Sequence, residues 1–180
     1  MSGGDGAPRR RPVQREHELS KAVRVFVRDA LDIIPTNYQF FAFDSAQKAT
    51  DNQRARMVAR GIVVGCPDTL LCAYGFQPFW AELKYGKNKP SGDQNRLIEK
   101  LVHIGHHVCV IRSVAEYAGA LNRLKFPLRQ NWLLIAADLD LKVDARITKA
   151  EQRIATPGRA PKAAPRYTAS KRMARKMYAK

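Results

Sequence analysis

The spacing of apolar residues changes several times along the chain, and each change predicts a new element. In residues 15–31 they recur at the i, i+3, i+4, i+7 spacing of a helix that buries one face. The aromatic run at 38–43 predicts a strand, and residues 51–60 predict a short helix that Gly61 ends. The first third of the chain therefore predicts helix, strand and helix.

Two apolar runs, at 69–74 and 79–84, flank the sequence Gly75-Phe76-Gln77-Pro78 and predict a β-hairpin. Ser91 and Gln94 have the spacing of a capping box, so a helix is expected from there to Gly105. The apolar positions expected on its buried face are Leu97, Ile98, Leu101 and Val102.

A short buried strand is expected at 108–111. Ser113 and Glu116 repeat the capping spacing before a helix that runs to about 124. After Pro127 the pattern predicts a helical extension over 128–154, which either caps the core or pairs subunits. Together these elements predict a mixed α/β domain.

Positive charge dominates the composition, with 32 Lys and Arg against 16 Asp and Glu, a net charge of +16 and a pI near 10.2. Such a balance favours a polyanionic partner, and nucleic acid is the first candidate. Residues 156–180 contain eight Lys and Arg and no acid, and they begin with an Ala- and Pro-rich stretch. We expect this tail and residues 1–14 to be disordered basic ends.

Cys66, Cys72 and Cys109 form an odd set without a disulfide framework, and they lack zinc-ligand spacing with the nearby histidines. We therefore expect buried free thiols. The N-terminus has no apolar signal region, and no apolar run reaches the eighteen or so residues of a membrane span. These features predict a reduced, cytoplasmic protein that does not span a membrane.

The predicted hairpin brings charged groups together. With its turn near Gly75, Asp68 would lie opposite Glu82 or Lys84, and Glu82 and Lys84 would share one face of their strand. Two carboxylates this close in an apolar strand pair are unfavourable unless a cation neutralises them. Mg²⁺ prefers such oxygens and can activate water beside a phosphate, so this arrangement predicts phosphodiester hydrolysis. Lys84 would position or deprotonate the water and neutralise developing charge.

These residues also resemble a known signature. Pro67-Asp68 followed by Glu82-Leu83-Lys84 is similar to the PD-(D/E)XK nuclease motif. Its surroundings resemble the VRR-NUC family over roughly residues 15–124. The shared patterns are G-x-P-D at 65–68, G-K-x-x-x-S-x-x-Q at 86–94, L-x-x-x-G at 101–105, V-x-V-x-R-S at 108–113 and E-x-x-L at 16–19.

The resemblance implies a restriction-endonuclease-like core over 15–126, a mixed sheet flanked by helices, followed by the helical extension at 127–155. It implies a Mg²⁺- or Mn²⁺-dependent endonuclease acting on DNA, with a preference for junctions or flaps, and the small domain is consistent with a homodimer. Asp68 and Glu82 would be the metal carboxylates, the Leu83 carbonyl a further ligand and Lys84 the catalytic lysine. Ser20 departs from the pattern, in which a glutamine follows E-x-x-L.

A further carboxylate, as metal ligand or catalytic group beside Asp68, Glu82 and the Leu83 carbonyl, is expected from the first helix. At 100° per residue from Leu19, Glu16 lies at about 60°, beside the apolar stripe, and Glu18 at about 260°. We therefore place Glu16 in the site and Glu18 in solvent, and the E-x-x-L match makes the same choice. Gln94 matches the family glutamine, although the capping box alone would also explain it.

Lys87 and Lys89 are expected to contact phosphates of the nucleic acid. Simpler explanations stay open: Asp68 as an ordinary turn residue, and Glu82 with Lys84 as a solvated edge-strand pair. A non-catalytic nucleic-acid-binding protein and an RNA-directed nuclease are the alternative functions.

Overall fold

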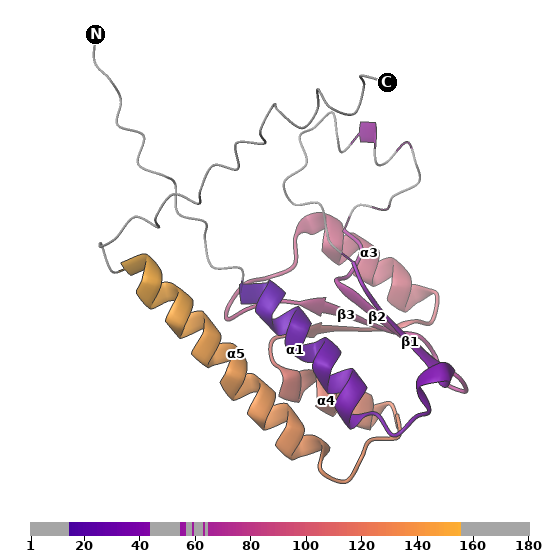
Figure 1. The fold of residues 1–180 in the computed structure, drawn as a ribbon. Coiled ribbons are helices and arrows are strands. Elements are labelled where there is room, and N and C mark those ends of the chain that lie inside the picture. The colour runs from indigo at the N-terminus through magenta and orange to yellow at the C-terminus, as the bar shows by residue number, and fades with distance from the viewer. Residues whose placement is uncertain (1–14, 44–54, 57–58, 60–62, 64, 156–180) are drawn as a thin grey trace, which may run out of the picture.

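The computed structural model describes residues 15–43, 55–56, 59, 63 and 65–155 (Figure 1). The helix expected at 51–60 lies mostly outside these residues, and the basic ends at 1–14 and 156–180 lie wholly outside them. In chain order the elements are α1 (Arg15–Ala30), a 3₁₀ turn (Pro35–Asn37), β1 (Tyr38–Ala42), β2 (Thr69–Ala73), β3 (Phe79–Leu83), α3 (Gly92–His103), β4 (His107–Ile111), α4 (Val114–Arg123) and α5 (Trp132–Ala155).

The four strands form one mixed sheet in the order β1-β2-β3-β4. The first two pairings are antiparallel, whereas β3 and β4 are parallel and are joined by α3, as a parallel pair requires a crossover connection. The predicted α/β class and its mixed sheet with flanking helices are confirmed.

The hairpin has the register that the sequence predicts. Thr69 pairs with Ala81 and Leu71 pairs with Phe79. Continued by one residue, this register sets Asp68, directly before the start of β2, against Glu82 of β3. The two carboxylates therefore meet where the antiparallel ladder ends.

The core lies between the sheet and the helices α1 and α4. Phe79, Ala81 and Leu83 alternate along β3 and are fully buried on this face. The ring of Phe79 packs edge-on against Tyr117 of α4, with centroids 5.3 Å apart. The apolar stripe of α1 supplies its other side through Leu19, Ala22, Val23, Phe26, Val27 and Ala30.

The predicted helical extension forms α5, which lies along α1 and α4 as an outer layer (Figure 1). It buries Ala136, Leu139, Val143 and Ile147. The carboxylate of Asp140 also accepts hydrogen bonds from the backbone N–H groups of Val114, at 2.7 Å, and Ala115, at 3.0 Å. The extension thus caps the core and the first turn of α4. No helix among the described residues is long and apolar enough to cross a membrane.

One packing prediction is wrong. Of the α3 residues, all of which are described, Gln94 alone is buried; Leu97, Ile98 and Leu101 are half-buried and Val102 is 53% exposed. The reason is the position of α3, whose main neighbour in the described sheet is the edge strand β4. One edge strand covers only part of the apolar stripe.

Candidate active site

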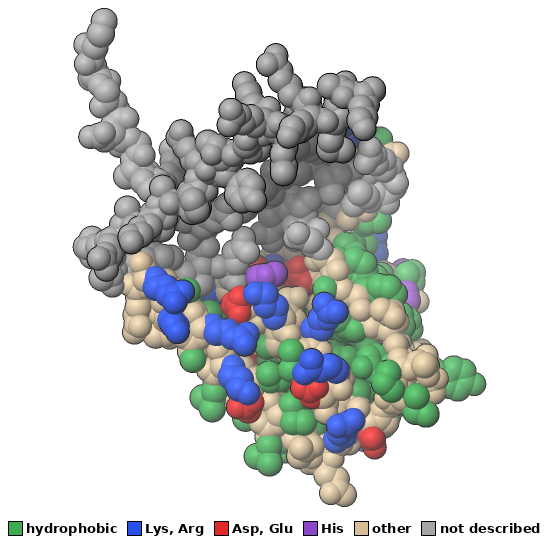
Figure 2. All heavy atoms as spheres, viewed as in Figure 1, with side chains coloured by type: hydrophobic (Ala, Val, Ile, Leu, Met, Phe, Trp, Pro, Cys, Tyr) green, Lys and Arg blue, Asp and Glu red, His purple; other side chains and the backbone are tan. Residues whose placement is uncertain are grey.

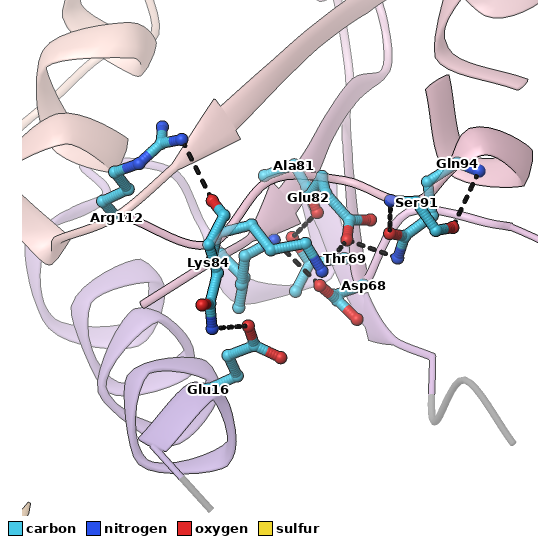
Figure 3. A network of polar contacts seen from close by, with 11 residues as sticks. Glu16, Asp68, Thr69, Ala81, Glu82, Lys84, Ser91, Gln94 and Arg112 are labelled. Atoms are coloured by element: carbon cyan, nitrogen blue, oxygen red, sulfur yellow. Dashed lines mark hydrogen bonds and ion pairs between the residues drawn. The ribbon is translucent and has the colours of Figure 1, made fainter. Parts of the chain in front are cut away.

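The chain brings Asp68, Glu82 and Lys84 together where β2 begins and β3 ends (Figure 3). Asp68 accepts a hydrogen bond from the backbone N–H of Leu83 at 2.8 Å. Asp68 is therefore more than an ordinary turn residue. Its hydrogen bond holds the Asp68 carboxylate against β3, the strand that carries the Glu82 carboxylate. Leu83 itself points into the core.

Glu82 and Lys84 form a buried ion pair. Their side chains lie on one face of the strand, and Lys84 Nζ is 2.6 Å from Glu82 Oε1. The Glu82 side chain is 0% exposed and that of Lys84 is 7% exposed. A solvated edge-strand pair is therefore excluded.

Gln94 serves the helix start and the site at once (Figure 3). Its side-chain oxygen accepts a hydrogen bond from Ser91 N at 2.8 Å, and its backbone N–H donates to Ser91 Oγ at 3.3 Å, which completes the predicted capping box. Its Nε2 donates to Glu82 Oε1 at 2.5 Å. The capping box is therefore present, and the same side chain also contacts the buried carboxylate of Glu82.

Gly65 holds the turn before Asp68 against the first turn of α3. It has a φ of +82°, which favours glycine, and a Cβ there would lie only 2.6–2.8 Å from the backbone of Asp93 and Gln94. The first residue of the G-x-P-D pattern thus lets two parts of the site approach each other closely.

Burial dominates the electrostatics of Glu82. It raises the pKa of this carboxyl from 4.5 to about 7, and the neighbouring carboxylates of Asp68 and Glu16 also raise the pKa, while Lys84 opposes them. Glu82 Oε2 is buried and has no hydrogen-bond partner among the described residues. Burial, with Glu82 and Asp68 nearby, also raises the pKa of the Cys66 thiol.

The two glutamates of the first helical turn lie in different surroundings. Glu16 accepts a hydrogen bond from Asn88 Nδ2 at 3.5 Å and lies on the site side of α1 (Figure 3). Glu18 forms ion pairs with Lys21 at 2.8 Å and Arg146 at 3.4 Å, and the Lys21 contact is the main cause of its lowered pKa. Glu18 was expected to be solvated, and this expectation is wrong: its carboxylate pairs with Lys21 of α1 and with Arg146 of α5.

Lys87 and Lys89 are exposed in the loop that joins β3 to α3. Arg112 holds this loop by donating to the backbone oxygens of Gly86, at 3.1 Å, and Asn88, at 3.3 Å. No role for Arg112 or Asn88 was expected from the sequence. The strand order could have indicated the role of Arg112. This residue follows β4, the loop follows β3, and the ends of two neighbouring parallel strands lie at the same edge of a sheet.

The side chains alone do not form a complete metal cage. Among the described residues, no group of three or more His, Cys, Asp or Glu side chains is placed to hold a metal ion. Mg²⁺ often uses only one or two carboxylates and keeps several waters. Asp68, the unpartnered Glu82 oxygen and the Leu83 carbonyl fit that mode of binding. The three cysteines are free and half-buried rather than fully buried.

Comparisons of the chain with protein-family models, curated proteins and solved structures find no match. Its function is therefore inferred from the chemistry of this cluster.

Proposed function

We propose that the protein is an endonuclease that uses Mg²⁺ or Mn²⁺ to hydrolyse DNA phosphodiester bonds at the cluster of Asp68, Glu82, Lys84 and Gln94. The observation that carries the proposal is the fully buried Glu82, whose Oε2 lacks a hydrogen-bond partner among the described residues. A second carboxylate and a buried lysine lie beside it.

A cation would resolve the unfavourable part of this arrangement. A buried acceptor left without a partner costs about 1–3 kcal/mol, and a neighbouring carboxylate adds repulsion. Asp68, Glu82 and the Leu83 carbonyl would hold the ion, with Glu16 close enough to raise the pKa of Glu82. When bound, the ion supplies neutralisation of the phosphate charge and activation of water.

The protein side chains then divide the remaining work. Lys84 is held by Glu82 with its ammonium group at the site, where it can orient the attacking water and stabilise charge that develops on the phosphate oxygens. Gln94 fixes the orientation of Glu82 from the start of α3. Lys87 and Lys89 are exposed on the adjoining loop and would contact phosphates of the bound strand.

DNA is the substrate that the resemblance to VRR-NUC nucleases implies, and branched DNA is the first form to test. End-labelled linear, flap and four-way-junction DNA, and a matched RNA, would each be incubated with Mg²⁺, with Mn²⁺ or with EDTA. We expect metal-dependent cleavage of DNA. Asp68→Asn should slow single-turnover cleavage at least about 100-fold, because it removes one carboxylate of the pair.

The matched control is Asp138→Asn, which removes an exposed carboxylate that pairs with Lys142 on α5. It should cleave like the wild type. Equal cleavage by Asp68→Asn would refute the site. DNA binding without cleavage under every metal condition would support the non-catalytic alternative, and cleavage of RNA alone would support the RNA-directed one.

A further inference from the structure

The outer surface of α1 carries a row of one His and three Lys or Arg side chains. His17, Lys21, Arg24 and Arg28 are all exposed and follow one another at the i, i+4, i+7, i+11 spacing, which places them on one face of the helix. This face is opposite the apolar stripe that packs on the sheet. The row therefore faces away from the core.

A second row with the same spacing lies on α5. It consists of Lys142, Arg146, Lys149 and Arg153, again all exposed. The two helices pack side by side and run antiparallel, because Arg15 at the start of α1 pairs with Glu151 near the end of α5, and Glu18 pairs with Arg146. Figure 2 shows Lys and Arg side chains gathered over these two helices.

Several of these cations are available for an external anion. Lys21, Arg28, Lys142 and Arg146 each pair with a carboxylate. Arg24, Lys149 and Arg153 form no ion pair within the described part of the chain. Exposed ion pairs contribute little to stability, so the paired cations can also turn towards a phosphate.

The rows begin next to the candidate active site. Arg15, two residues before the first member of the α1 row, has its guanidinium carbon 5.3 Å from the ring centroid of Tyr85, the residue after Lys84. Glu16 contacts Asn88 of the loop that carries Lys87 and Lys89. A nucleic-acid strand leaving the site on this side would meet the start of α1 and the end of α5 first.

We infer that the cationic face, defined as the Lys and Arg residues of the two rows on α1 and α5, binds the sugar-phosphate backbone of a DNA duplex and guides it into the candidate active site. The choice of DNA as ligand rests on the proposed function. The first and last members of the α1 row, His17 and Arg28, are eleven positions apart, a length of about 16 Å, which corresponds to about five phosphates along one strand. The α5 helix thus has a binding role besides its packing role.

The test compares two triple variants of the full chain. Arg24→Gln/Lys149→Gln/Arg153→Gln removes the three cations of the face that form no ion pair with the described residues. Arg123→Gln/Lys125→Asn/Arg129→Gln removes the same charge from exposed positions at and after the end of α4, and Asn suits the positive φ of Lys125. Binding to a short fluorescent DNA duplex would be measured by anisotropy in EDTA over a series of NaCl concentrations.

We expect the face variant to raise the Kd about tenfold and to flatten the slope of log affinity against log salt by about 0.9 for each lost phosphate contact. The control variant should change both quantities much less. An unchanged Kd and slope in the face variant would overturn the inference, as would an equal loss in the control or wild-type binding to anionic lipid vesicles in preference to DNA.

The two proposals fail separately. If the wild type binds DNA through this face but does not cleave it in the presence of any metal ion tested, the proposed function fails and the inference stands. If the wild type cleaves DNA and the face variant binds it normally, the inference fails and the proposed function stands.

Discussion

Glu82 is held by two neighbours of different character, the ammonium of Lys84 and the amide of Gln94, both of which contact the same oxygen. Its other oxygen is buried without a partner among the described residues. The ionised form is therefore only partly compensated, and burial raises its pKa to about 7. A carboxyl so placed makes the stability of the protein depend on pH.

The first prediction is that stability in EDTA falls as the pH rises from about 4.5 to about 7. In this window the folded state keeps a proton on Glu82 that the unfolded chain has released, so the free energy of unfolding decreases with pH. The contribution is about 3 kcal/mol over the window. Urea denaturation at several pH values would measure it.

Glu82→Gln should flatten this dependence, because the amide does not titrate. Glu99→Gln, on the exposed side of α3, is the matched control and should keep the wild-type dependence. The same pH dependence in Glu82→Gln and wild type would contradict the description of Glu82.

At this scale the sequence could predict which side chains meet across the hairpin, because register and strand period fix that. It named Gln94 as a candidate, but it could not predict that the Gln94 side chain contacts Glu82 or that Glu18 pairs with Arg146. Arg146 is 128 residues away in sequence. Such contacts depend on how α3 and α5 pack, which local spacing does not encode.

At the scale of elements, the start of α3 depends on the turn at Gly65. The second prediction is that Gly65→Ala destabilises the protein by about 3 kcal/mol, because the new Cβ meets the backbone of Asp93 and Gln94 in addition to the strain of a positive φ. Gly86→Ala is the matched control: its φ is +58° and its Cβ would meet nothing within 4 Å.

Gly86→Ala should lower the free energy of unfolding by only about 1 kcal/mol, the ordinary cost of a non-glycine residue in the left-handed conformation. Thermal denaturation of both variants would give the difference. Equal losses would show that the close approach between Gly65 and α3 does not contribute to stability.

The elements themselves were largely predictable. The capping spacing at Ser91 and Ser113 gave the starts of α3 and α4, and the hydrophobic period gave α1. The cap at Ser113 differs in one detail, since the carboxylate of Glu116 accepts from Arg112 N rather than from Ser113 N. Periodicity could not show that Val102 stays exposed, because it identifies an apolar face and not what covers that face.

At the scale of the whole molecule, α5 joins the core to the cationic face. The third prediction is that Leu139→Ala lowers the free energy of unfolding by about 3 kcal/mol, because Leu139 is 8% exposed and packs in the core. Leu141→Ala, on the same helix but 71% exposed, should change it by less than about 0.5 kcal/mol. Urea denaturation of both variants would measure the difference.

Equal effects of the two leucine substitutions would mean that α5 does not pack as described. The sequence predicted the helix but left open whether it caps the core or pairs subunits. Its contact with α1 joins residues more than a hundred positions apart, so this contact follows from the assembled fold rather than from local pattern.

The most direct test of the central claim, that Asp68 and Glu82 share a divalent cation, is equilibrium binding of Mn²⁺ measured by calorimetry without nucleic acid. We predict that the wild type and Glu18→Gln, whose carboxylate pairs with Lys21 and Arg146 away from the site, bind Mn²⁺ with equal affinity. Asp68→Asn should bind it at least about tenfold more weakly. Unchanged Mn²⁺ affinity in Asp68→Asn, or no binding by the wild type, would contradict the claim.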